Sequence, residues 1–280
     1  MQGKTVVITG ATSGIGEVAA DKLAGMGARI VFIARDPARG EETLKHLRAI
    51  APGAAHAVYY ADLSRLSELK RVAGEIAAAE PKIDVLVNNA GAMFAAREVT
   101  EDGLEKTFAL NHMAYFVLTN LLLPSLKAAG RARIVSTASD AHKGARLDFT
   151  DLQSERGYSG FAVYGRSKLM NILFTRELAR RLEGTGVTAN CLHPGFVASR
   201  FGDESGGIFS FGVKLAKNFA ITPERGAETI VHLAASPEVE RTSGGYFYKS
   251  KPATPTREAQ NDADAAKLWQ VSAEISGVGA

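Results

Sequence analysis

Short apolar runs alternate with longer amphipathic segments along the 280 residues of the chain. The apolar runs are rich in Val, Ile and Ala, which is typical of buried β-strands. They cover residues 4–9, 28–34, 55–60, 83–88, 133–138, 187–192 and 245–248. The amphipathic segments predict helices over residues 14–26, 37–49, 64–79, 102–129, 159–183 and 223–235.

Strands as continuously apolar as these are covered on both faces, which requires a parallel sheet with right-handed helical crossovers. The pattern therefore predicts an α/β fold, a doubly wound (Rossmann) parallel sheet of about seven strands with helices on both faces. No internal repeat, low-complexity segment or long linker divides the sequence. We expect one domain over residues 1–280.

Two irregular segments, 140–158 and 199–221, follow predicted strands on their carboxyl side, where open α/β sheets bind ligands. Each is either a wall of a substrate site or surface decoration. The second segment carries Phe209, Phe211 and Phe219 in a glycine-flanked stretch. These rings either form an apolar lid or dock a short helix on the core, and the sequence leaves both readings open.

Composition and charge exclude several classes of function. The net charge is +3, but Lys and Arg are mixed with Asp and Glu without a basic block, so we expect no nucleic-acid partner. The single cysteine, Cys191, rules out an internal disulfide and reads as an inert buried strand residue. The six histidines lack metal-ligand spacing, so we expect no metal. No apolar run approaches the about 18–20 residues of a membrane span, and the first strand begins at Lys4; we expect no membrane anchor and a cytoplasmic location.

A glycine-rich turn joins the first predicted strand to the first helix in the stretch VVITGATSGIGEVAADKL. Such a turn presents backbone N–H groups at a helix N-terminus, where they stabilise a pyrophosphate. Gly10, Gly14 and Gly16 allow the tight turn and the close approach, and the spacing leaves room for Thr12 and Ser13 to contact phosphate oxygens. A plain strand-to-helix connection could also use glycines, but the flanking strands favour a dinucleotide site.

The end of the second predicted strand distinguishes NADP from NAD. A carboxylate there binds the ribose 2′-hydroxyl, whereas a guanidinium binds a 2′-phosphate. This chain has Ala34 followed by Arg35, which favours NADP, with Arg39 as a second contact. Asp36 is either a ribose ligand or the cap of the next helix, and we prefer the cap.

Tyr164 and Lys168 lie four residues apart in a predicted helix, on the same face. A cation close to a phenol favours the phenolate and lowers its pKa, which makes the pair useful for proton transfer near neutral pH. The spacing alone is weak evidence, because such pairs also decorate helix surfaces.

Several further motifs occur in a fixed order: TGxxxGIG at the glycine turn, Asp62–Leu63, NNAG at 88–91, Asn111, Ser139, YGRSK at 164–168 and HPG at 193–195. With these the sequence resembles the short-chain dehydrogenase/reductase family over its whole length. The stretches IARDPARGEETL, DLQSERGY and SKLMNILFTRELARRL are similar to its retinol dehydrogenase-like branch.

The resemblance implies a catalytic tetrad. Tyr164 exchanges a proton with the substrate oxygen, Ser139 hydrogen-bonds that oxygen, Lys168 tunes the tyrosine and binds the nicotinamide ribose, and Asn111 holds a water of a proton relay. Asn111 could instead kink a helix, and Ser136 competes with Ser139; we prefer Ser139, the later position of the motif. The long gap from Ser139 to Tyr164 fits an inserted substrate segment.

Asp62 and Leu63 flank the adenine in this interpretation, Asn89 and Gly91 line the ribose, Pro194 to Val197 border the nicotinamide, and Ser199 keeps a hydroxyl near the carboxamide. The complete set of expected cofactor contacts is Gly10, Thr12, Ser13, Gly14, Ile15, Gly16, Arg35, Arg39, Asp62, Leu63, Asn89, Ala90, Gly91, Tyr164, Lys168, Pro194, Gly195, Val197 and Ser199.

The expected activity is NADP(H)-dependent interconversion of a hydrophobic ketone or aldehyde and its alcohol by hydride transfer, with Tyr164 as proton donor and acceptor. Two alternatives stay open: reduction of a carbon–carbon double bond, and a catalytically silent NADP-sensing regulator. The long predicted helices 102–129 and 159–183 suggest a homodimer or homotetramer, as is common in the family.

Overall fold

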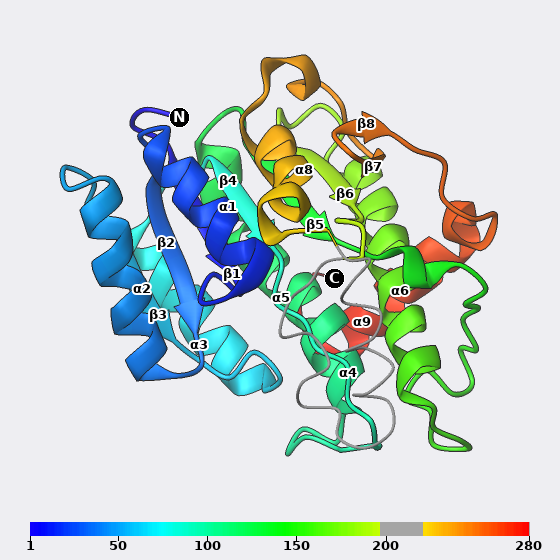
Figure 1. The fold of residues 1–280 in the computed structure, drawn as a ribbon. Helices are drawn as coiled ribbons and strands as arrows, with labels where there is room; N and C mark the ends of the chain where they lie inside the picture. Colours follow the sequence, from blue (N-terminus) through cyan, green and yellow to red (C-terminus); the bar gives the residue numbers. More distant parts are fainter. Residues whose placement is uncertain (197–220, 280) are drawn as a thin grey trace.

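The computed structural model describes residues 1–196 and 221–279 (Figure 1). Its described strands form one sheet in the order β3-β2-β1-β4-β5-β6-β7-β8. The strands are β1 Thr5–Thr9, β2 Arg29–Ala34, β3 Ala57–Tyr60, β4 Val85–Asn88, β5 Arg133–Thr137, β6 Thr188–Leu192, β7 Tyr246–Tyr248 and β8 Lys251–Pro252. The first seven pair in parallel, which confirms the predicted doubly wound sheet. The two-residue β8 pairs antiparallel with β7 and was not expected.

The strand order reverses at β1, which pairs with β2 on one side and with β4 on the other. Val7 lies opposite Val31 of β2 and Leu86 of β4. The chain therefore leaves β1 and β4 in opposite directions at their carboxyl ends, which is where doubly wound sheets have their ligand crevice.

Helices cover both faces of the sheet (Figure 1). The described helices are α1 Gly14–Gly25, α2 Pro37–Ile50, α3 Leu66–Ala79, α4 Lys106–Phe108, α5 Ala114–Ala128, α6 Gly160–Arg181, α8 Pro223–Ala235 and α9 Asp262–Ser276. One apolar cluster joins α1, α2 and α8 to the sheet, and the other joins α3, α5, α6 and α9 to the opposite face. Successive side chains of β1 enter different clusters: Val6 and Ile8 pack with α1, and Val7 packs with α3 and α5.

Two helix predictions need correction. The helix expected over 102–129 begins at Lys106, contains a π-helical turn at Ala109–Met113, and continues as α5. Glu105 determines this start, because its buried carboxylate accepts hydrogen bonds from the backbone N–H groups of Thr107 and Phe108 at 2.8 and 2.7 Å. The second correction is α9, which the apolar pattern did not indicate.

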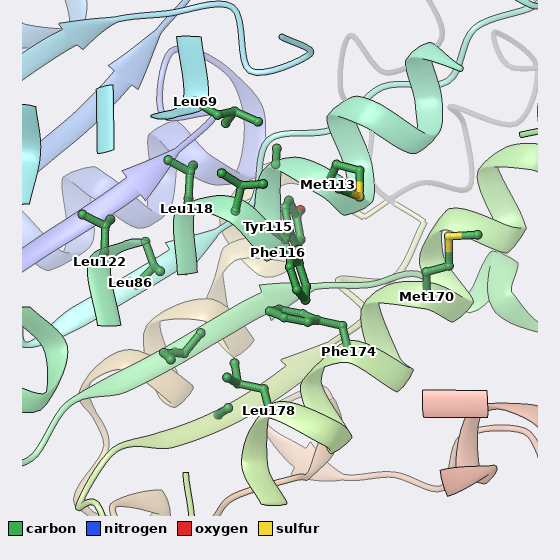
Figure 2. Packing of buried hydrophobic residues seen from close by; sticks show 14 of the residues in the cluster. Leu69, Leu86, Met113, Tyr115, Phe116, Leu118, Leu122, Met170, Phe174 and Leu178 are labelled. Carbon is green, nitrogen blue, oxygen red and sulfur yellow. The ribbon is translucent and has the colours of Figure 1, made fainter. Parts of the chain in front are cut away.

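Helix α9 packs against α5 and α6 through aromatic side chains. Phe116 of α5 and Phe174 of α6 meet with ring centroids 5.9 Å apart (Figure 2). Trp269 of α9 stacks on Phe174 at 5.9 Å and meets Phe116 edge-on at 4.9 Å. His112 also bonds Ser272 of α9 at 2.8 Å. Part of the surface of α5 and α6 is therefore covered by the chain itself, and the pairing of these helices across a dimer stays a prediction.

Cys191 lies buried on β6, and burial raises the pKa of its thiol to about 12, which confirms an inert strand residue. Within residues 1–196 and 221–279, no helix combines the length and apolar content that crossing a membrane requires.

Candidate active site

The glycine turn between β1 and α1 is tight enough to require glycine. Gly10 and Gly14 have φ angles of +70° and +60°, in the left-handed region that side chains disfavour. A β-carbon on Gly16 would lie 2.1 Å from the carbonyl oxygen of Gly10. Ser13 precedes the helix with an extended backbone and makes no side-chain capping bond, so its exposed hydroxyl remains available to a ligand. Thr12 and Ile15 are half-buried beside it.

Asn89 fixes this turn to the next strands. Its Nδ2 donates to the carbonyl oxygens of Thr9 and Gly10 at 3.2 and 3.3 Å, and its Oδ1 accepts from Thr137 Oγ1 at 3.2 Å. Thr9 Oγ1 in turn accepts from the N–H groups of Asn89 and Ala90. Asn89, expected at the ribose, therefore also holds the crevice together. Thr9 and Thr137 were not predicted as site residues, although a threonine that ends an apolar strand is a usable signal.

The end of β2 carries the residues expected to select the dinucleotide. Asp36 caps α2 by accepting from the backbone N–H of Arg39 at 3.0 Å, so its carboxylate acts as the preferred helix cap. Arg35 and Arg39 are exposed beside it. Burial raises the pKa of Asp62, but hydrogen bonds from Ser64 and the nearby charge of Arg35 outweigh this and lower it overall. Arg35 and Asp62 therefore share one edge of the crevice.

The two residues expected to flank the adenine differ in exposure. The Asp62 carboxylate accepts hydrogen bonds from the backbone N–H and the hydroxyl of Ser64, at 2.9 and 2.7 Å. The neighbouring Leu63 is buried in the apolar cluster of α3. The carboxylate therefore has partners of its own, and Leu63 contributes packing behind the crevice.

Ser139 and Tyr164 come together although 25 positions separate them in the numbering. Ser139 begins the short helical turn Asp140–His142 after β5, and its Oγ accepts from the N–H of Ala141 at 3.2 Å. A side-chain hydrogen bond joins Ser139 to Tyr164 of α6. Ser136 lies on β5, fully buried, and its hydroxyl has no partner among the described residues. The geometry thus favours Ser139 over Ser136.

Lys168 lies one turn after Tyr164 and is buried. Its Nζ donates to the carbonyl oxygen of Thr137 at the end of β5, at 3.0 Å, and lies 5.4 Å from the centre of the Tyr164 ring. Asn171 and Tyr115 also point to the Thr137 carbonyl, at 3.4 and 3.5 Å. The end of β5 thereby fixes the position of the lysine.

Asn111 lies in the π-helical turn and bonds both sides of one peptide group. Its Oδ1 accepts from the N–H of Ala92, and its Nδ2 donates to the carbonyl of Ala92, both at 2.9 Å; Nδ2 also donates to Ser167 at 3.0 Å. A β-carbon on Gly91 would lie 3.1 Å from Asn111 Oδ1 and 3.4 Å from Lys168 Nζ. Gly91 therefore lies between these two side chains, and the relay water stays a prediction.

Burial dominates the protonation of the tyrosine and the lysine. It raises the pKa of Tyr164, an effect that the hydrogen bond with Ser139 partly offsets, and it lowers the pKa of Lys168 to about 7. Burial, with the Ser139 bond opposing it, sets the direction of the Tyr164 shift, so the structure does not show the lowering of the pKa that the sequence predicts from the neighbouring lysine.

The last expected contacts follow β6. Pro194 and Gly195 are half-buried, and Gly195 has a φ of +91°. Val197 and Ser199 lie outside the described residues, as does the segment 199–221 except for its last residue, Ile221. Segment 140–158 packs against the chain that follows β4: Tyr158 donates to the carbonyl of Phe94 at 3.0 Å.

A hollow of about 730 Å³ lies away from these residues, beside the amino ends of β5 and β6. Two of its arginines are paired with acidic residues, Arg131 with Glu240 at 3.0 Å and Arg176 with Asp262 at 2.8 Å. Because no expected site residue lines it, we place the candidate active site at the carboxyl ends of the strands.

Comparison with known proteins identifies the family. Residues 4–206 match the short chain dehydrogenase family. Retinol dehydrogenase 14 of Mus musculus is 42% identical over 294 residues, which cover 99% of this chain and 87% of the relative. Retinol dehydrogenase 12 of Homo sapiens is 40% identical over 278 residues, with coverages of 99% and 88%. The chain belongs to the short-chain dehydrogenase family of oxidoreductases.

Solved structures share the fold of this chain. An uncharacterised protein from Mycobacterium paratuberculosis superposes with a TM-score of 0.80 at 32% identity, covering 99% of this chain and 94% of the other. A short chain dehydrogenase from Burkholderia cenocepacia in complex with NADP gives a TM-score of 0.70 at 26% identity, covering 88% and 96%. The resemblance to the retinol dehydrogenase-like branch is confirmed.

Proposed function

We propose that this protein is an NADP(H)-dependent oxidoreductase that interconverts a hydrophobic ketone or aldehyde and its alcohol, with Tyr164 as the proton donor and acceptor. The observation that carries the proposal is the hydrogen bond between Ser139 and Tyr164 beside buried Lys168, at the carboxyl end of β5.

The residues at the β1 turn fit a dinucleotide. Gly16 packs on Gly10 with no room for a β-carbon, which keeps the backbone of the turn and the N-terminus of α1 close together. Backbone N–H groups at this helix end and the free hydroxyl of Ser13 would bind the pyrophosphate. Arg35 would bind the 2′-phosphate, since the carboxylate of Asp36 is engaged in capping α2. When bound, the dinucleotide supplies or accepts the hydride.

The side chains of the site would handle the proton and the substrate oxygen. Because burial raises the pKa of Tyr164, its phenol stays protonated at neutral pH and can donate a proton to a carbonyl oxygen. Ser139, bonded to the same hydroxyl, would stabilise negative charge that develops on that oxygen. Lys168 and Asn111 flank Gly91, where they would hold the ribose and connect the proton to solvent.

Two exposed aromatic side chains support a hydrophobic substrate. Phe161 lies one turn before Tyr164 on α6 and is 57% exposed, and Phe196 follows Gly195 and is 54% exposed. Single exposed apolar side chains are common on protein surfaces, but these two lie close to Tyr164 and Gly195 in the sequence, where a hydrophobic substrate would contact them. The names of the related retinol dehydrogenases point to a substrate of the same kind, a long apolar alcohol or aldehyde.

Turnover tests the proposal directly. The protein is incubated with NADPH and a panel of hydrophobic aldehydes and ketones, and the loss of cofactor absorbance is followed while the products are identified. We expect carbonyl reduction by the parent and a loss of about 10²–10⁴-fold in Tyr164→Phe, because one positioned proton donor is removed. Tyr59→Phe on β3 is the matched control and should keep full turnover. Binding of NADPH without turnover would favour the silent sensor, and saturated carbonyl products would favour double-bond reduction.

A further inference from the structure

His142 occupies a place in the site that none of the expected roles uses. It ends the short turn that begins with Ser139, and its side chain is fully buried. Its Nδ1 lies 2.7 Å from the carbonyl oxygen of Ser139, and its Nε2 lies 3.3 Å from the backbone nitrogen of Thr256. One imidazole therefore joins the turn of the candidate catalytic serine to a segment more than a hundred positions later in the chain.

These partners determine the tautomer. A backbone N–H can only donate, so Nε2 must accept from Thr256, and the ring proton must lie on Nδ1. Nδ1–H then donates to the Ser139 carbonyl, which can only accept. Burial lowers the pKa of His142, so the ring is neutral at neutral pH.

The imidazole ring of His142 also packs against an aromatic side chain. Tyr246 of β7 meets it edge-on with centroids 5.4 Å apart, and His193 stacks on Tyr246 at 5.9 Å. Packing of this kind restricts the orientation of the imidazole, so a shift of Nδ1 requires a shift of β7.

The bond from Nδ1 acts on the same residue whose hydroxyl meets Tyr164. The Ser139 carbonyl also accepts from the backbone N–H of His142 at 3.2 Å, so two donors fix this peptide group. The hydroxyl of Ser139 is bonded by Ala141 of the same turn. Fixing the peptide therefore fixes the direction from Ser139 towards Tyr164.

We propose that His142, as the neutral Nδ1–H tautomer, is a positioning residue that sets the placement of the Ser139 hydroxyl against Tyr164 and couples it to the segment 253–260. The proposal rests on the proposed function, since it assigns His142 a part in the same reaction. Misplacing a reacting group by about 1 Å can cost on the order of 10²-fold in rate, so the bond to Ser139 should matter more for kcat than for substrate binding.

Two amide substitutions separate the two bonds. In His142→Asn the side-chain nitrogen lies near the position of Nδ1 and can still donate to Ser139, but it does not reach Thr256. In His142→Gln the amide oxygen reaches the position of Nε2 and can accept from Thr256, but the donor to Ser139 is lost. His46→Gln, at an exposed ring bonded to Asp21, is the matched control.

We expect the two variants to have opposite effects on kcat and on the hydrogen exchange of segment 253–260. The Gln variant should lose about 10–100-fold in kcat with KM and the NADPH dissociation constant nearly unchanged, and hydrogen exchange of segment 253–260 should match the parent. The Asn variant should stay within about threefold of the parent kcat but exchange faster in 253–260. Equal losses of kcat in both variants, or losses that follow the melting temperature, would overturn the positioning role.

Imidazole ¹⁵N NMR of the full chain gives a readout that does not need turnover. We expect the His142 resonances of the Nδ1–H tautomer, and an Nε2–H or doubly protonated ring at neutral pH would overturn the proposal. Absence of carbonyl turnover in the parent would contradict the proposed function and the catalytic part of this inference, whereas the tautomer result stands independently of it.

Discussion

The α-carbon of Gly16 lies so close to Gly10 that a β-carbon added to it would come within 2.1 Å of the Gly10 carbonyl oxygen and 2.4 Å of Asn89 Nδ2. Backbone cannot move aside as a flexible side chain can, so any larger residue must displace the start of α1.

Gly16→Ala should therefore lower the free energy of unfolding by about 1–3 kcal/mol and weaken NADPH binding. Gly25→Ala, at the other end of α1, is the control: its β-carbon would meet only Ile50, at 3.9 Å. It should stabilise the protein by about 0.5–1 kcal/mol, because alanine is the better helix former. Chemical denaturation and calorimetric titration measure both quantities. Equal NADPH affinity in the two variants would contradict the proposed cofactor turn.

Arg35 should determine the preference for NADPH over NADH. Arg35→Ala removes a charge-assisted hydrogen bond to a 2′-phosphate, so the NADPH dissociation constant should rise about 10–100-fold while that for NADH changes little. Arg48→Ala, in the last turn of α2, serves as a control for net charge. An unchanged ratio of the two dissociation constants would remove Arg35 from the phosphate site.

The raised pKa of Tyr164 predicts opposite behaviour of the two reaction directions with pH. A group whose pKa is raised keeps its proton to higher pH, so reduction, which needs the phenol, should persist through the neutral range. Oxidation of the alcohol needs the phenolate and should rise as the pH increases above neutral. Ser139→Ala removes the bond that lowers this pKa and should move the rise to higher pH. Rates measured in both directions across the pH range test this, and an oxidation rate already constant in weak acid would refute it.

Trp269 should hold α9 on α5 and α6. Trp269→Ala removes contacts with Phe174, Phe116 and Arg181, whose guanidinium lies 4.3 Å from the indole ring, and should cost about 3–5 kcal/mol of unfolding free energy. Exposure of the apolar face beneath should also increase self-association. Trp269→Phe should show a smaller loss of both kinds. Chemical denaturation measures the unfolding free energy, and light scattering measures self-association. If the parent is a dimer and Trp269→Ala dissociates it, α9 itself forms the interface and the predicted increase in self-association is wrong.

Most of the sheet was predictable because its strands are buried on both faces and read as unbroken apolar runs. Helix α9 was not, because its buried side consists largely of Ala265, Ser272, Ala273 and Ser276, which form no strong apolar stripe. Its ends carried the better signal: Asn261 caps it, and Gly277 closes it with a φ of +66°. The π-helical turn at Ala109–Met113 departs from helical periodicity over too few residues to be recognised.

The candidate site was predictable to the extent that its chemistry lies in motifs. Tyr164 and Lys168 share a helix, and their spacing alone places them together. The contributions of Thr9, Thr137 and His142 could not be read in the same way, because each depends on a hydrogen bond with a segment distant in the sequence. Only the three-dimensional pairing shows that the carbonyl of Thr137 holds Lys168, and that the ring of His142 reaches Thr256.

The position of α9 also has a consequence for biosynthesis. Residues 262–276 leave the ribosome only after every strand of the sheet has been made, yet they cover aromatic side chains of α5 and α6. A nascent chain whose sheet has already assembled therefore exposes apolar surface on α5 and α6 until this helix emerges. During this interval chaperones would bind that surface, and truncated products that lack α9 would aggregate through it.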